Sequence, residues 1–158
     1  MVEILNDQDI EKLVKEEKHA SVTLDDFFSQ MKEKKSHRET DITILREDGS
    51  YFKVILRQNS LNPLDFSAIL GIVAKGSNQL IKLRRYNGKS HEHRNKLEAE
   101  QFYGFHIHYA TERYQNIGFK EELYAVPTER YANLRDALKC LAQDCNITFP
   151  GSNQIELF

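Results

Sequence analysis

The sequence predicts an α+β domain in which an antiparallel sheet of about five strands carries the N- and C-terminal helices on one face. Three observations predict it. Apolar and polar residues alternate on both sides of the Asp48-Gly49 pair, further apolar segments follow after short turns, and both ends of the chain carry apolar residues at helical spacing. Strands joined by short turns pair antiparallel, and the apolar stripes of terminal helices need a sheet face to cover. A length of 158 residues suits one such unit, so residues 1–158 are expected to form a single domain.

The N-terminal part is predicted to hold two helices. Asn6 can cap the first helix, with Asp9 three residues later, and Leu5 can pack against Ile10. Residues 21–35 place apolar side chains at spacings of three and four, which indicates a second helix laid against the sheet. These apolar side chains are Leu24, Phe27, Phe28 and Met31.

The sheet is predicted from the central segments. A hairpin spans 41–58, because Asp-Gly readily adopts the positive φ angles of a tight turn. Asn62-Pro63 ends the second strand, and further strands are expected near 66–73, 80–86 and 102–109. The short connections predict that neighbouring segments lie side by side and antiparallel.

The last helix is expected to begin at Asn133, with Asp136 three residues later and a stripe formed by Leu134, Ala137, Leu138, Leu141 and Cys145. Cys140 lies off this stripe on the same helix, so a disulfide to Cys145 would break helical geometry, and neither residue is expected to be a catalytic thiol. Reduced cysteines, an N-terminus without a signal-peptide pattern and the lack of a long apolar run predict a cytoplasmic protein without a membrane segment.

Candidate functional residues gather in the stretch 84–114, which holds four of the six histidines as His91-x-His93 and His106-x-His108. In the predicted strand 102–109, alternation turns His106 and His108 away from the helices. The same alternation brings polar side chains of other strands to the histidine side: Lys53, Arg57, Lys82, Arg84 and Tyr86. It leaves Arg85 on the inner side. We therefore expect an open polar face centred on His106 and His108.

One hypothesis for this face is metal-independent cleavage of RNA, which needs no cofactor. His106 and His108 would transfer protons, Arg84 or Arg57 would hold the phosphate and Tyr86 would orient it. The candidate catalytic residues are therefore His106, His108, Arg84 and Tyr86. The candidate ligand-binding residues are Arg57, Lys82, Arg85, His91, His93, Arg94 and Arg113.

A second hypothesis is a zinc site, because His-x-His on a strand puts two imidazoles on one side. Its ligands would be His91, His93, His106 and His108. A third is a module that binds nucleic acid or protein without catalysis, since residues 82–96 hold six Lys and Arg side chains around Tyr86. The formal net charge of −2 supplies no global positive field, so such binding would depend on this local patch. Whether the protein is an enzyme stays open between these hypotheses.

Three blocks of the sequence resemble a family of small prokaryotic proteins of unknown function. The blocks read RRYNGKSHEH at 84–93, FHIHYATERYQ at 105–115 and YANLRDAL at 131–138, and NPLDFS at 62–67 also fits. The resemblance covers roughly the C-terminal two thirds of the chain and implies a prokaryotic, cytoplasmic protein, but no activity. The small size and the lack of common enzyme motifs favour a toxin or defence protein, the class in which a ribonuclease would fit.

Overall fold

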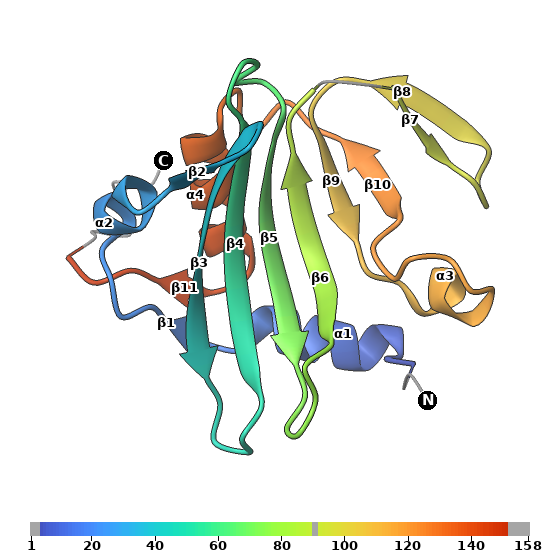
Figure 1. Cartoon of the computed structure of the whole chain (residues 1–158). Helices are drawn as coiled ribbons and strands as arrows, with labels where there is room; N and C mark the ends of the chain where they lie inside the picture. The colour runs from blue at the N-terminus through green and yellow to red at the C-terminus, as the bar shows by residue number, and fades with distance from the viewer. Residues whose placement is uncertain (1–3, 90–91, 152–158) are drawn as a thin grey trace.

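The computed structural model describes residues 4–89 and 92–151, and it has the predicted α+β architecture (Figure 1). The main sheet has seven strands in the order β10-β9-β6-β5-β4-β3-β2, and all neighbours pair antiparallel. Its strands are β2 (Lys32–Lys34), β3 (His37–Leu45), β4 (Tyr51–Asn59), β5 (Phe66–Val73), β6 (Leu80–Asn87), β9 (His106–Tyr109) and β10 (Tyr124–Pro127). The hairpin expected over 41–58 is confirmed as β3 and β4, with Gly49 at φ +89° in the turn.

The other strands form two small sheets. β1 (Lys18–His19) pairs parallel with β11 (Ile147–Thr148), and β7 (Glu92–Asn95) pairs antiparallel with β8 (Glu100–Tyr103). The helices are α1 (Asp7–Lys15), α2 (Leu24–Ser29), α3 (Glu112–Asn116) and α4 (Leu134–Asp144). Within the described residues, no helix is both long and apolar enough to cross a membrane.

The hydrophobic core lies between one face of the main sheet and the helices α1 and α4, which pass behind the sheet in Figure 1. Phe52, Val54 and Leu56 of β4 are buried in it, as the alternation predicted. α4 contributes the stripe expected from the sequence, and Cys140 and Cys145 are both buried and free. The caps are also as expected, since Asn6 accepts a hydrogen bond from the Asp9 amide and Asn133 from the Asp136 amide.

Two predicted elements are wrong in extent. The helix expected over 21–35 ends at Ser29, because Lys32–Lys34 pairs with β3 as an edge strand instead. The single strand expected over 102–109 is broken at Gly104, whose φ of +134° turns the chain between β8 and β9. Strands β2 and β10, of three and four residues, add to the expected five at the two edges of the sheet. Such short strands carry too few residues for alternation to reveal them.

A β-bulge in β6 reverses the facing of its second half. Leu70 pairs with Arg84 and Gly71 with Lys82, so Leu83 is the extra residue. A bulge of one residue moves every following side chain to the other face. Arg84 and Tyr86 therefore face the helices and Arg85 faces the histidines, whereas alternation alone predicted the opposite.

Candidate metal centre

Three buried histidines converge beside the outer face of the sheet, which is the face away from α1 and α4. His106 and His108 come from β9, and His93 comes from β7 of the hairpin that lies next to β9 and β10 in Figure 1. One ring nitrogen of each histidine lies within 4.8 Å of the other two. The ring centroids are 4.9–5.3 Å apart, and the residues are only 1–8% exposed. The three side chains thus form one compact group of possible metal ligands.

The side chain of Asn95 attaches the hairpin β7–β8 to the free edge of β10. Asn95 donates from Nδ2 to the Ala125 carbonyl at 2.7 Å and accepts from the Ala125 amide at 2.9 Å. The amide of Asn95 thus replaces a neighbouring strand at this edge, and both backbone groups of Ala125 are satisfied. Phe102, the partner of His93 across the hairpin, packs on both His93 and His106 at 5.3 and 5.5 Å. These contacts hold His93 against β9.

Hydrogen bonds determine which nitrogen of each ring carries the lone pair. The Asn95 Oδ1 atom is an acceptor, so His93 must donate to it from Nε2, at 2.9 Å. His106 donates from Nδ1 to the Gly104 carbonyl, and His108 donates from Nδ1 to the Glu122 carbonyl, both at 2.8 Å. In their neutral forms the three rings therefore keep lone pairs on Nδ1 of His93 and on Nε2 of His106 and His108. Such outer hydrogen bonds commonly orient histidine ligands in metal sites.

Arg85 and Glu122 form an ion pair next to this group. Arg85 Nη2 lies 3.2 Å from Glu122 Oε2 and donates a long hydrogen bond of 3.5 Å to His108 Nε2. Arg85 Nε and Glu122 Oε2 are buried and make no hydrogen bond within the described part of the chain. Burial, and to a smaller extent the charge of the nearby Arg85, lower the pKa of His108 to about 2. His108 is therefore neutral at physiological pH, as a metal ligand must be.

The prediction of an open face is wrong for the two histidines at its centre. His106 and His108 do lie on the side away from the helices, but they are 1% and 2% exposed and covered by the hairpin. An alternating strand pattern specifies a direction and cannot reveal what a distant segment places on that face.

The predicted catalytic set is not brought together. Arg84 and Tyr86 lie on the helix face, where Tyr86 donates to Asp144 of α4 at 2.5 Å and Arg84 stacks on the Tyr109 ring. The bulge in β6 separates both of them from His106 and His108 by the thickness of the sheet.

The predicted ligand-binding residues are also divided. His93 belongs to the histidine group and Arg85 adjoins it, whereas Arg57 and Lys82 lie elsewhere on the outer face. Arg94 is exposed on β7, and Arg113 pairs with Glu98 near α3. His91 lies outside the described residues. Of the four histidines in the zinc hypothesis, the structure describes His93, His106 and His108, and these three lie together.

Sequence reasoning missed Asn95, Phe102 and Glu122. A weak signal existed for Asn95, which lies two residues after His93 and so shares its side of a short strand. Glu122 precedes β10 in a connecting segment, where no periodicity relates it to the histidines.

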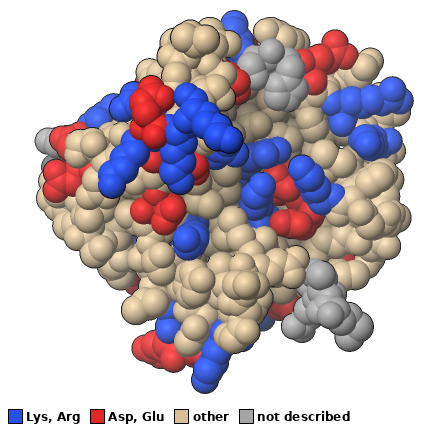
Figure 2. All heavy atoms as spheres, in the orientation of Figure 1, with Lys and Arg blue, Asp and Glu red and all other residues tan. Residues whose placement is uncertain are grey.

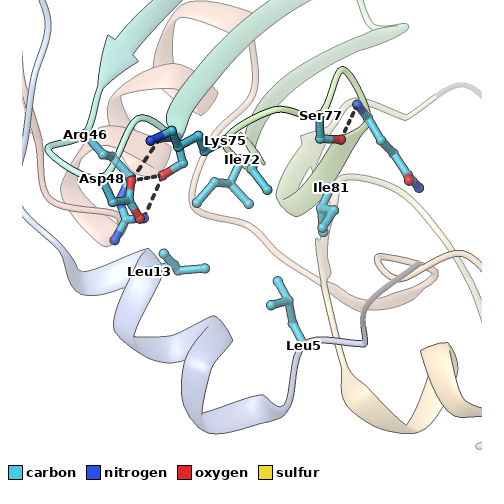
Figure 3. Close-up of a pocket in the computed structure, with 11 residues that line it drawn as sticks. Leu5, Leu13, Arg46, Asp48, Ile72, Lys75, Ser77 and Ile81 are labelled. Carbon is cyan, nitrogen blue, oxygen red and sulfur yellow. Dashed lines mark hydrogen bonds and ion pairs between the residues drawn. The ribbon is translucent and has the colours of Figure 1, made fainter. Parts of the chain in front are cut away.

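A separate cavity of about 360 Å³ lies between α1 and the turns that follow β3 and β5 (Figure 3). Leu5, Leu13, Ile72 and Ile81 form its apolar side. The polar groups at its rim largely bond to one another, because Arg46 donates hydrogen bonds to Glu16, Asp48 and Ser50. A ligand would find little unused hydrogen-bonding capacity on Arg46.

Comparisons of this chain with protein-family models, with curated proteins and with solved structures found no match. Function is therefore inferred from the geometry of the site.

Proposed function

We propose that the protein binds a divalent transition metal, with zinc as the first choice, through His93, His106 and His108. The observation that carries this proposal is the convergence of three buried imidazoles whose lone-pair nitrogens are set by outer hydrogen bonds. Three imidazoles are a known ligand set for zinc, which then keeps a fourth position for water or another ligand. Imidazole nitrogen suits zinc, copper, iron and nickel better than magnesium or calcium, which prefer oxygen.

Zinc titration of chelator-treated protein tests the proposal. Wild-type protein should take up one zinc ion per chain in competition with a chromophoric chelator. His93→Gln, His106→Gln and His108→Gln should each weaken zinc binding by about 10- to 100-fold or more, because each removes a nitrogen ligand while keeping a polar side chain of similar reach. At a free zinc concentration of 100 times the dissociation constant, the free energy of unfolding should rise by about 2.7 kcal/mol.

His19→Gln is the matched control, because His19 is exposed and its side chain lies next to Glu17. Its zinc affinity should equal that of wild type. If wild-type protein takes up no zinc, or if His19→Gln weakens binding as much as the three other variants do, the proposed centre is wrong.

A phosphate-bearing ligand such as RNA is the second candidate, favoured by a row of polar side chains on the outer face. The row consists of consecutive partners across β4, β5, β6 and β9, namely Arg57, Ser67, Asn87 and His106. Asn87 and His106 are buried, so a ligand would first meet Arg57 and Ser67. A polar cavity of about 260 Å³ adjoins the start of this row and is lined by His37, Arg57 and Ser67 among others. Figure 2 shows basic and acidic side chains interleaved on this face. Contacts to phosphate groups would therefore be confined to a few basic side chains. We place such binding in a cytoplasmic setting, which suits two reduced cysteines.

Anisotropy of labelled single-stranded RNA, titrated at several salt concentrations, tests this second candidate. Binding should weaken as salt rises, and Arg57→Gln should reduce both the affinity and the salt dependence, because one phosphate contact is lost. A flat salt response, or an unchanged affinity of Arg57→Gln, would contradict it. Cleavage of the RNA in EDTA that His106→Gln/His108→Gln abolishes would favour the metal-independent ribonuclease mechanism over zinc.

A further inference from the structure

The ion pair of Arg85 and Glu122 places a cation beside the proposed zinc position. Arg85 Nη2 donates a long hydrogen bond of 3.5 Å to His108 Nε2, the atom that would bind the ion, so a bound ion would replace this hydrogen bond. A Zn–N bond is about 2.1 Å long, so this guanidinium nitrogen would lie within about 5.6 Å of a bound ion. Arg85 is held there from the other side by Glu122, whose own carbonyl orients His108. A bound zinc ion and the Arg85 guanidinium would therefore be two cations in one largely buried space.

The ion pair of Arg85 and Glu122 does not balance the charge that a bound zinc ion would bring to the three histidines. Zinc on three neutral imidazoles keeps its full charge of +2, and the charges of Arg85 and Glu122 cancel each other. Buried net charge is costly unless a counter-charge accompanies it. The space also holds one donor and one acceptor that are buried and make no hydrogen bond within the described residues, Arg85 Nε and Glu122 Oε2. An anion with several oxygens would satisfy both the ion and the guanidinium.

We infer that the metal-loaded centre binds a phosphate-type oxyanion, with one oxygen on the ion and another on Arg85, which makes Arg85 the specificity-determining residue. This inference rests on the proposed zinc site. Hydrogen phosphate carries the charge of −2 that balances the centre, and guanidinium presents paired donors that match phosphate oxygens. A chloride ion has neither the charge nor the second oxygen. Phosphate and zinc therefore bind cooperatively at this centre.

Coupling between zinc and inorganic phosphate is the direct test, because each ligand must strengthen the other by the same factor. Zinc affinity is measured by chelator competition with and without phosphate, with potassium chloride at equal ionic strength as the reference and free zinc corrected for its complex with phosphate. Wild-type protein should bind zinc at least about 5- to 10-fold more tightly with phosphate. Arg85→Gln should still bind zinc, at least as tightly as wild type without phosphate, and should lose the coupling.

Arg85→Gln leaves Glu122 buried without its cation, so Arg85→Gln/Glu122→Gln serves as a second variant in which both charges are removed. Circular dichroism checks that both fold. Lys53→Gln is the matched control, because Lys53 lies on the same sheet face but on β4, paired with Asp41. It should keep the full coupling.

The outcomes separate this inference from the zinc proposal. Absence of zinc binding by wild-type protein overturns the zinc proposal and the inference with it. Zinc binding without a phosphate effect overturns the inference alone. Zinc binding that Glu122→Gln weakens as strongly as a histidine variant, again without a phosphate effect, assigns the fourth position to Glu122 and also overturns the inference. If both Arg85 variants keep the coupling between zinc and phosphate, Arg85 does not bind the phosphate and the inference is wrong.

Discussion

Replacing Lys18 by methionine is expected to lower the free energy of unfolding by about 4 kcal/mol, measured by urea denaturation. Lys18 is 1% exposed, and its Nζ donates to the carbonyls of Leu13, Val14, Glu16 and Cys145 at 2.7–2.9 Å. These carbonyls lie at the C-terminal ends of α1 and α4, where helices leave acceptors unpaired and the helix dipole is negative. Methionine fills the space but leaves these buried acceptors without a donor.

The charge of Lys18 contributes to this effect. Burial lowers the pKa of its ammonium group to about 8, so the group is still mainly protonated at pH 7. It also lies 4.6 Å from the centre of the Phe52 ring, a favourable cation–π distance. Lys15→Met is the control, because Lys15 is exposed and pairs with Glu11 one turn away. It should change stability by less than about 0.5 kcal/mol. A loss below about 1 kcal/mol for Lys18→Met would mean that water replaces the lost donor.

Asn95→Ala is expected to have the second largest effect, on stability and on metal binding together. It removes both hydrogen bonds to the Ala125 backbone, which is 1% exposed, and should cost about 3 kcal/mol in urea denaturation. It also removes the acceptor that sets the proton of His93 on Nε2, so zinc affinity should fall by about 10- to 100-fold. The two losses share a cause, because Asn95 both attaches the hairpin and orients a ligand.

Asn78→Ala is the matched control for this prediction, because Asn78 is exposed in the connection between β5 and β6. It should change neither stability nor zinc affinity measurably. If Asn95→Ala loses stability while its zinc affinity stays at the wild-type value, then His93 does not depend on Asn95 for its orientation, and the proposed ligand set needs revision.

Local sequence signals predicted the elements that depend on neighbouring residues. The Asp48-Gly49 turn predicted the β3–β4 hairpin, and Asn6 and Asn133 predicted the starts of α1 and α4. The facing of β9 was also predictable, because apolar or aromatic residues alternate with His106 and His108 along the sequence from Phe105 to Tyr109. Arg84 and Tyr86 were predicted on the wrong face of the sheet. The bulge depends on how β5 and β6 pair, so it cannot be predicted from the sequence of β6 alone.

The sequence by itself determined the α+β class, the main hairpin and the side of the sheet on which His106 and His108 lie. These features follow from periodicity and turn chemistry, which act over a few residues. Only the tertiary structure decided that His93 meets them and that Arg85 rather than Arg84 stands beside them. These relations depend on the bulge in β6, on the turn at Gly104 and on the bonds of Asn95 to β10. Each one joins segments that are distant in sequence, so pairing and packing determine it.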